Sequence, residues 1–349
     1  MARIVIHAGM SKTGSTSIQR WIVDNCSRLR REHGVQVLVA ASGTRRNPTD
    51  EVRLETYESG DVNSVALMKA WRAAERSPLI ARRFVQDLAS FADDYPIVLI
   101  TSEALSQAFW RGDEPFLGGF EQLARNHDVR VAYYVRPQHT ALEASWREWG
   151  FKQPRLQPSD WVLEQGDWSM HYPRALGAVR EFAPNVAFEM RPFVPELLDG
   201  RSPVADFARR FLSVNEAGGD VHLNPGLPLE FVNMLRHSPR GWFWTKRVAG
   251  VAPERYPRFK VRAVLDGLEI GESPEIRRSR LILQQHCHEV FEPENQELIR
   301  RLEWPIANFV PPAELDGDWD LNELDDLWTP DASDAERALL YHTLRAALA

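Results

Sequence analysis

Residues 3–20 limit what this chain can fold into more than any other segment. Arg3 to His7 form a short apolar, β-branched run that is typical of a buried strand. Residues 9–17 are mostly small and polar, and apolar side chains follow at helical spacing from Ile18. This order predicts a phosphate-binding loop, because amides at a helix N-terminus point at an anion and the helix dipole favours negative charge there. The alternative is a plain strand-to-helix turn.

The position of the lysine separates two kinds of phosphate loop. The loop of nucleotide triphosphatases places Lys directly after its second glycine. Gly9 and Gly14 have the spacing of the two glycines, but Ser15 follows Gly14 and the lysine of this loop is Lys12. The segment therefore lacks the lysine after the second glycine that defines the triphosphatase loop.

The run Lys12-Thr13-Gly14-Ser15-Thr16-Ser17 resembles the 5′-phosphosulfate loop of sulfotransferases. These enzymes use 3′-phosphoadenosine 5′-phosphosulfate (PAPS) as donor, and the loop resembles that of the bacterial sulfotransferase-like members. The resemblance implies that the amides of residues 14–17 hold the 5′-phosphate, with the hydroxyls of Ser15, Thr16 and Ser17 as further donors. It also implies that Lys12 neutralises the charge that develops on the bridging oxygen as the S–O bond breaks.

A second stretch, residues 131–149, resembles the 3′-phosphate motif of the same family. Arg136 follows an apolar strand, and its guanidinium suits bidentate phosphate contact. The serine of the family motif is expected at Ala144, whereas Ser145 lies one residue later. Either the turn holds one more residue, with Ser145 on the phosphate, or Ser145 points elsewhere. The structural alternative for Arg136 taken alone is an exposed arginine at a strand end.

Glu103 is the candidate general base. It follows the apolar run 96–101, which predicts a strand buried on both faces of a parallel sheet, and so it lies at the carboxyl edge where ligands bind. Sulfuryl transfer needs a base to remove the proton of the acceptor hydroxyl. His7 and His139 are rival bases. The structural alternative is a helix start, with Ser102 as the cap and Glu103 in the first turn.

Strands and helices alternate along the first two thirds of the chain, which predicts an α/β fold. We expect a three-layer, P-loop-type, mainly parallel sheet flanked by helices, and a helical C-terminal portion. A single sulfotransferase-like domain spans 1–349, with a nucleotide-binding core over 1–213 and a mainly helical acceptor-side or lid portion over 214–349. The predicted strands are 3–7, 35–40, 96–101, 129–135 and 186–193.

Composition excludes several classes of partner. The net charge is −7, from 42 basic and 49 acidic residues, which argues against nucleic acid as a partner. The two cysteines, Cys26 and Cys287, fit a reducing cytoplasm better than a disulfide framework. No apolar run approaches the roughly 18 residues of a membrane span, and the first residues do not have the pattern of a secretory signal.

The sequence thus predicts a cytoplasmic sulfotransferase that moves a sulfuryl group from PAPS to a hydroxyl or amine. The resemblance implies adenosine 3′,5′-bisphosphate (PAP) as the second product and no metal. Carbohydrate, lipid and small-molecule acceptors all remain open, as does the oligomeric state. The alternatives are a P-loop kinase-like phosphotransferase, and a nucleotide-binding protein of the same fold without catalytic activity.

Overall fold

The computed structural model describes residues 1–10, 12–42, 52–59, 62, 78–150, 153, 155–215, 229, 232 and 273–328. The chain forms two compact units that alternate along the sequence. The first comprises Met1–Pro137, His171–Val221 and Glu297–Ile306, and the second comprises Gln138–Met170, His222–Gln296 and Ala307–Ala349. Residues 138–170, assigned from the sequence to the nucleotide-binding core, therefore belong to the second unit. Residues 216–228, 233–272 and 329–349 of the expected helical portion lie outside the described residues.

The first unit is built on a six-stranded sheet with the order β3-β2-β4-β1-β5-β6. All neighbouring strands are parallel except β2 and β3, which pair antiparallel. The α/β class and the mainly parallel sheet predicted from the sequence are confirmed. The strands are β1 (Arg3–His7), β2 (Val35–Ser42), β3 (Val52–Thr56), β4 (Ile97–Thr101), β5 (Asp128–Val135) and β6 (Ala187–Pro192).

The edge strand β3 was not predicted, since its polar surroundings in the sequence are typical of a loop. Its side chains explain the error. Leu54 is buried, whereas Arg53 and Glu55 on either side of it are exposed. An edge strand that buries one face alternates apolar and polar residues, so a five-residue strand of this kind contains little apolar sequence.

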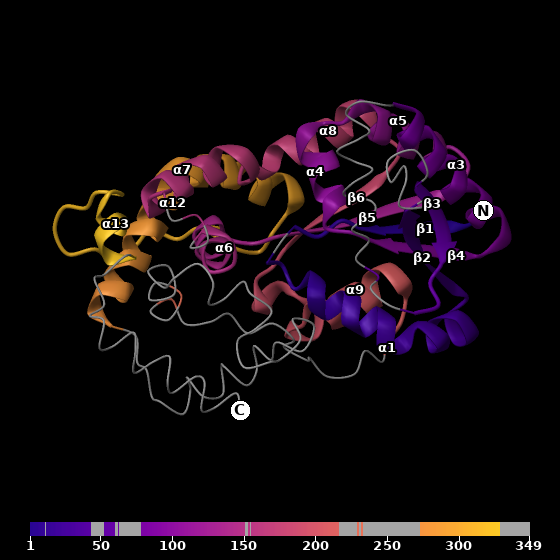
Figure 1. Ribbon diagram of the computed structural model, residues 1–349, viewed down its shortest axis with the longest axis horizontal. Coiled ribbons are helices and arrows are strands. Elements are labelled where there is room, and N and C mark those ends of the chain that lie inside the picture. Colours follow the sequence, from indigo (N-terminus) through magenta and orange to yellow (C-terminus); the bar gives the residue numbers. More distant parts are fainter. Residues whose placement is uncertain are drawn as a thin grey trace. The chain divides into compact units, whose positions relative to one another are not determined.

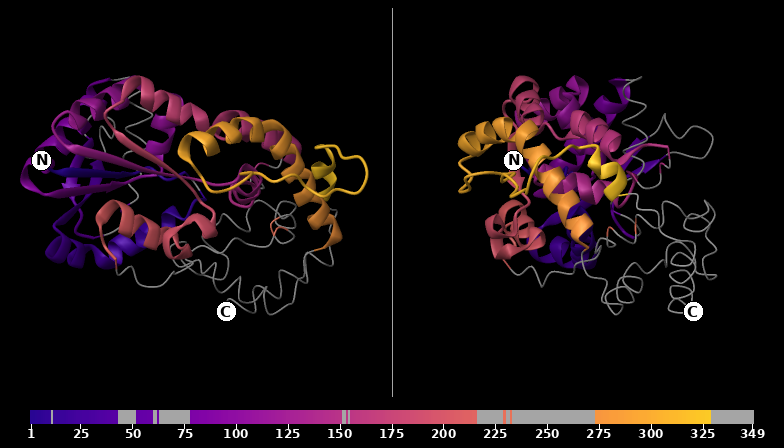
Figure 2. Two further views of the ribbon diagram at one scale, coloured as in Figure 1. Left: turned by 180° about the vertical axis from the view of Figure 1, so that it is seen from behind. Right: turned by 90° about the vertical axis from the view of Figure 1, so that its left-hand side faces the viewer.

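Helices cover both faces of the sheet (Figure 1). Helices α1 and α9 lie on one face, and α3, α4, α5 and α8 lie on the other, as the view from behind also shows (Figure 2). The bounds are α1 (Ser15–His33), α3 (Pro78–Asp94), α4 (Ala104–Arg111), α5 (Glu114–Ala124), α8 (Tyr172–Phe182) and α9 (Pro203–Leu212), with short 3₁₀ turns η2 (Pro195–Leu197) and η3 (Asp199–Arg201) before α9.

The two faces of the sheet carry different cores. On the α1 and α9 face, Ile18 and Ile22 pack with Phe207 and Phe211 against Tyr134 of β5. The other face carries a group of aromatic rings, in which neighbouring centroids lie 5.2–6.4 Å apart, formed by Phe84, Phe109, Phe116, Phe120, Tyr133 and Phe188. Strand β1 lies between these two cores, which is why its sequence is apolar without alternation.

Helix α1 begins and ends at glycines in the left-handed conformation. Gly14 precedes the helix with φ 76°, and Gly34 follows it with φ 64° and donates its amide to Leu29 O. Glycine is common at this position, because it adopts the left-handed conformation without steric cost. Because α1 starts directly after the loop, the conformation of Gly14 fixes the direction in which the first-turn amides point.

The described part of the second unit contains helices and irregular segments but no strand. It contains α6 (Gln138–Trp146), α7 (Pro158–Ser169), α13 (Glu323–Leu327) and most of α12 (Pro274–Leu302), which continues into the first unit. The buried Trp146 ring lies 6.2 Å from Trp161 and 5.4 Å from Trp328. No helix among the described residues has the length and apolar character that crossing a bilayer requires.

Candidate functional site

The carboxyl ends of β1, β4 and β5 lie side by side. His7, the last residue of β1, is in register with Thr101 of β4 and with Ala132 of β5. The chain passes from β4 on one side of β1 to β5 on the other, so the strand order reverses at β1. Ligands of open α/β sheets bind outside the carboxyl ends at such a point. The loop after β1, Glu103 after β4 and Arg136 after β5 all start from this edge.

The loop after β1 turns back on itself before α1 begins. Lys12 and Gly14 both have a left-handed backbone, with φ 69° and 76°. Inside the turn, the Thr13 hydroxyl donates to Met10 O at 2.5 Å. Left-handed backbone is uncommon for lysine, so this conformation of Lys12 costs free energy that the rest of the loop must offset.

The start of α1 leaves amides available to an anion. The amides of Ser17 and Ile18 donate to Gly14 O at 2.9 and 3.1 Å. Those of Ser15 and Thr16 belong to the first turn, where no carbonyl of the same helix can accept them. The predicted phosphate contact through the Ser17 amide would therefore compete with a helix hydrogen bond, whereas contacts through Ser15 and Thr16 would not.

Gly14 is a position of the loop where the surrounding residues leave no space for a side chain. A Cβ there would lie 2.9 Å from Phe193 Cε2 and 2.9 Å from Pro203 Cγ. Phe193 follows β6 and Pro203 begins α9, so the loop is packed against two later segments of the first unit. Its shape is therefore set by the tertiary fold as well as by its own sequence.

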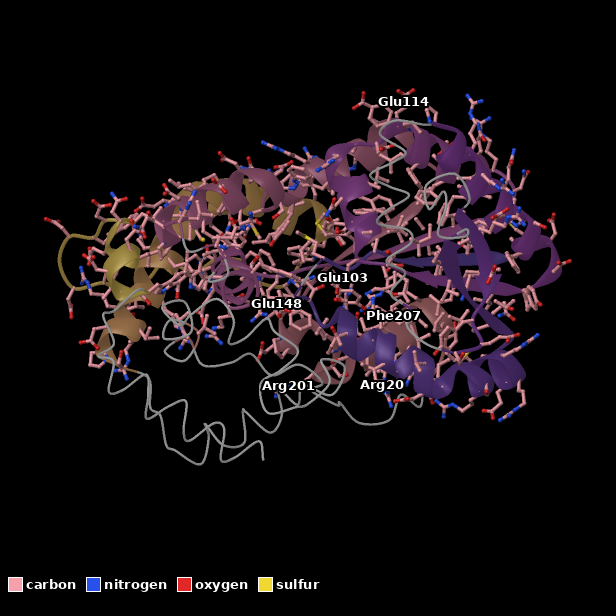
Figure 3. All side chains as sticks on the ribbon, viewed as in Figure 1. Arg20, Glu103, Glu114, Glu148, Arg201 and Phe207 are labelled. Atoms are coloured by element: carbon pink, nitrogen blue, oxygen red, sulfur yellow. The ribbon has the colours of Figure 1, made fainter. Side chains whose placement is uncertain are left out.

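Glu103 and Ser15 are brought together. The Ser15 hydroxyl donates a hydrogen bond to Glu103 Oε1. Figure 3 shows Glu103 beside the N-terminal end of α1. A carboxylate at this position is favoured by the helix dipole, as an anionic ligand would be. The candidate base and one candidate phosphate donor are thus neighbours, which the sequence did not reveal.

The helix-start interpretation of Glu103 is correct in part. Helix α4 begins at Ala104 and Glu103 is its N-cap residue, but the Glu103 side chain makes no capping hydrogen bond. The hydroxyl of Ser102, the expected cap, is buried and has no hydrogen-bond partner in the part of the chain that the structure describes. The carboxylate of Glu103 therefore turns to Ser15 and away from the amides of its own helix.

Arg136 reaches back to the loop from the end of β5. Its Nη1 donates to Lys12 O at 3.1 Å, and its Cζ lies 5.9 Å from the centroid of the Phe193 ring. Tyr172 donates its hydroxyl to Arg136 O at 2.6 Å. Burial lowers the pKa of the Arg136 guanidinium, and the interaction with Tyr172 partly offsets this. Arg136 is thus a half-buried cation held against the loop, and the interpretation as an exposed strand-end arginine is wrong.

His7 does not have the properties of a general base near neutral pH. It is buried, its Nδ1 lies 2.8 Å from Thr101 Oγ1, and burial lowers its pKa to about 3. A general base works best when its pKa is near the working pH. The Gln19 amide also reaches Thr101 Oγ1, at 3.4 Å. Neither Thr101 nor Gln19 was a predicted site residue, because a single polar side chain in an apolar run carries no sign of its partner.

Ser145 and His139 lie on α6, in the second unit. The carbonyl of Ser145 accepts the amides of Glu148 and Trp149 at 3.1 and 2.8 Å, where the helix ends. The roles of Ser145 on the 3′-phosphate and of His139 as a base stay predictions. Among the described residues, no three His, Cys, Asp or Glu side chains are grouped as metal ligands would be.

A scan of protein-family models and a search of curated proteins both returned no match to this chain.

Proposed function

We propose that the protein is a PAPS-dependent sulfotransferase with a P-loop-type fold. The observation that carries the proposal is the meeting of three separate stretches at one edge of the sheet. Glu103 accepts a hydrogen bond from Ser15, and Arg136 donates one to the carbonyl of Lys12. Residues separated by 88 and 124 positions in the sequence are thereby joined around one helix N-terminus. A plain strand-to-helix turn gives no reason for a cation and a carboxylate to converge there.

In the proposed reaction the acceptor oxygen attacks the sulfur of PAPS in line with the bond that breaks. The acceptor hydroxyl gives its proton to the Glu103 carboxylate as the new S–O bond forms. The old S–O bond breaks towards the 5′-phosphate, which leaves as part of PAP and gains negative charge. Lys12 and the first-turn amides of α1 stabilise this charge. Arg136 contacts the 3′-phosphate through its guanidinium group. We place this chemistry in the cytoplasm, on a carbohydrate, lipid or small-molecule acceptor.

A Mg²⁺-dependent phosphotransferase is the second candidate, and one contact favours it. In P-loop nucleotide triphosphatases a loop hydroxyl and a carboxylate from a neighbouring strand hold the Mg²⁺ of the nucleotide. Ser15 and Glu103 are a pair of that type at the corresponding edge of the sheet. Against it stands the loop sequence, in which the lysine precedes Gly14 by two residues. A nucleotide-binding protein without turnover is the third candidate.

Nucleotide binding separates the three candidates. Isothermal titration with PAP, with and without Mg²⁺, is compared with titration of Mg-ATP. The proposal predicts tight PAP binding that Mg²⁺ does not change, weak Mg-ATP binding, and transfer of labelled sulfuryl from PAPS in an acceptor screen. Preference for Mg-ATP would overturn it in favour of the phosphotransferase. PAP binding without transfer to any acceptor would leave the non-catalytic protein.

Lys12→Ala tests whether the loop after β1 takes part in the transfer reaction. We expect this variant to lose most of the transfer rate, because the leaving phosphate loses its cation. Arg20→Ala is the matched control, since Arg20 is an exposed cation on α1, outside the loop, that pairs with Asp24. Full activity in Lys12→Ala would show that the loop has been assigned wrongly.

A further inference from the structure

His7 carries a buried nitrogen without a hydrogen-bond partner. Nδ1 faces Thr101, but Nε2 is buried and lacks a partner among the described residues. The ring lies between Phe207 and Tyr134, at centroid distances of 5.2 and 6.1 Å. Buried polar groups in proteins nearly always have a partner, and one that has none requires an explanation. If His7 only filled space in the core, an apolar side chain could do the same without burying a nitrogen that lacks a partner.

The partners of Thr101 decide which nitrogen of His7 carries the proton. Gln19 can only donate to Thr101 Oγ1 through its amide nitrogen, at 3.4 Å. The hydroxyl proton of Thr101 then needs an acceptor, and His7 Nδ1 at 2.8 Å supplies it. The ring is neutral because burial lowers its pKa to about 3. A neutral imidazole that accepts at Nδ1 has its hydrogen on Nε2, so the group without a partner is an N–H donor.

This N–H donor faces the inside of the loop. A Cβ built on Gly9 would lie 2.8 Å from His7 Nε2 and 3.4 Å from Thr13 Oγ1. A Cβ at residue 9 would therefore occupy the position directly beside Nε2, between His7 and the Thr13 hydroxyl. Gly9 does not have the positive φ that would itself require glycine. The missing side chain is thus explained by the space in front of Nε2.

We propose that the Nε2–H of His7 is a further donor to the anion in this loop, reaching it through the space that Gly9 leaves open. The proposal rests on the proposed function only in that the loop binds an anionic phosphate or phosphosulfate group. Gln19 and Thr101 act as positioning residues, which hold the tautomer that presents the hydrogen. Lys12 and the α1 amides supply charge and dipole to the same anion. His7 adds a neutral donor whose position does not depend on a flexible side chain.

Two substitutions separate the two nitrogens of His7. His7→Gln retains an amide where Nε2 lies, and His7→Asn retains one where Nδ1 lies. Loss of a hydrogen bond to a charged group weakens binding by about 10- to 100-fold. We expect PAP affinity in His7→Gln to stay within a few-fold of wild type and in His7→Asn to fall by that amount. Gly9→Ala should also weaken binding, because its Cβ fills the space. His33→Asn, at the far end of α1, is the control.

A spectroscopic readout tests the contact directly in the wild-type protein. In protein labelled with ¹⁵N-histidine, the His7 signals are assigned by their loss in His7→Gln. We expect a protonated Nε2 and an unprotonated Nδ1, and a downfield shift of the Nε2 proton on addition of PAP or inorganic pyrophosphate. This measurement is made on the wild-type protein, so it tests the contact even if His7→Asn does not fold.

The outcomes distinguish this inference from the proposed function. If PAP binds the wild type but neither moves the Nε2 proton nor discriminates between the His7 variants, the sulfotransferase proposal survives and the role of His7 is wrong. If PAP does not bind while pyrophosphate moves the Nε2 proton, the role of His7 holds and the sulfotransferase proposal fails. If neither anion binds, both are wrong.

Discussion

Ser15, the first residue of α1, gives its side-chain hydrogen bond to Glu103, the residue that follows β4 and Ser102. The carboxylate of Glu103 therefore lies at the positive end of the α1 dipole, where the proposed function requires the 5′-phosphate. A phosphate that takes the Ser15 hydroxyl must separate this pair. Binding of PAPS would then release the Glu103 carboxylate from its hydrogen bond with Ser15. The two events are coupled through this one hydroxyl group.

Replacing Glu103 tests that coupling. Glu103→Gln keeps the shape and removes the negative charge beside the phosphate, so we expect PAP to bind as well as in wild type or up to several-fold tighter. Without a base, sulfuryl transfer should slow by roughly 10²- to 10⁴-fold. Titration calorimetry and transfer of labelled sulfuryl measure the two effects separately. Glu114→Gln, on the exposed start of α5, is the control (Figure 3). Transfer at a near wild-type rate would remove Glu103 from the mechanism.

The left-handed backbone of Lys12 predicts that Lys12→Gly makes the protein more stable and less active. Because Lys12 has φ 69°, Lys12→Gly relieves a left-handed conformation that costs roughly 1 kcal/mol for a residue with a Cβ. We expect the variant to gain up to about that amount in free energy of unfolding, reduced by the greater entropy of glycine in the unfolded chain. Its transfer rate should fall by about 10²- to 10³-fold, as for the loss of an electrostatic group at a transition state.

Lys12→Ala completes this test, because it removes the same ammonium group and keeps a Cβ. Its unfolding free energy, measured in urea, should stay near that of wild type, while its activity should fall as far as in Lys12→Gly. A gain of stability in both variants would mean that the lysine side chain, and not the backbone conformation, is the source of the cost.

Gly14 is where the loop should tolerate a side chain least. Gly14→Ala combines a left-handed φ of 76° with contacts of 2.9 Å to Phe193 and Pro203. We expect a loss of roughly 2–4 kcal/mol in unfolding free energy, as the sum of backbone strain and overpacking. Gly177→Ala, inside α8 with open space at its Cβ position, is the control and should stabilise by about 0.5–1 kcal/mol. Equal stability of the two variants would contradict the loop geometry.

The elements that could be predicted from the sequence are those with a strong local pattern. The buried strands β1, β4 and β5 are mostly apolar, and Gly34 directly after α1 is typical of a helix end. Strand β3 was missed, and the start of helix α4 was considered only as the structural alternative for Glu103. The eight residues of α4 follow the apolar run directly, and β3 buries a single face at the sheet edge.

The contacts of the site could be predicted only in outline. The rule that parallel strands end at one edge brings Lys12, Glu103 and Arg136 to the same region, as expected. Which atoms meet depends on the strand order, which places β4 and β5 on either side of β1. The hydrogen bond from Arg136 to the Lys12 carbonyl and the partnership of His7 with Thr101 follow from that order. The strand order cannot be predicted from a local pattern in the sequence.

The buried His7 should make the stability of the protein depend on pH. Its pKa is about 3 in the folded protein and near 6.5 when the chain is unfolded. Between these values the unfolded state binds one more proton than the folded state, so stability falls as the pH is lowered from 6.5 towards 3. At about 1.36 kcal/mol per pH unit, this side chain alone should cost roughly 2 kcal/mol between pH 7.5 and pH 5.

Urea unfolding of wild type and His7→Gln at pH 7.5 and pH 5 isolates this effect, because the other titrating groups are common to both proteins. The buffers must be free of phosphate and sulfate, since an anion that binds the folded loop would add stability of its own. We expect the difference in unfolding free energy, wild type minus variant, to become less favourable by roughly 2 kcal/mol at the lower pH. A difference that does not change with pH would mean that His7 accepts a proton in the folded protein, and that its Nε2 is reached by water or by an acceptor at the loop.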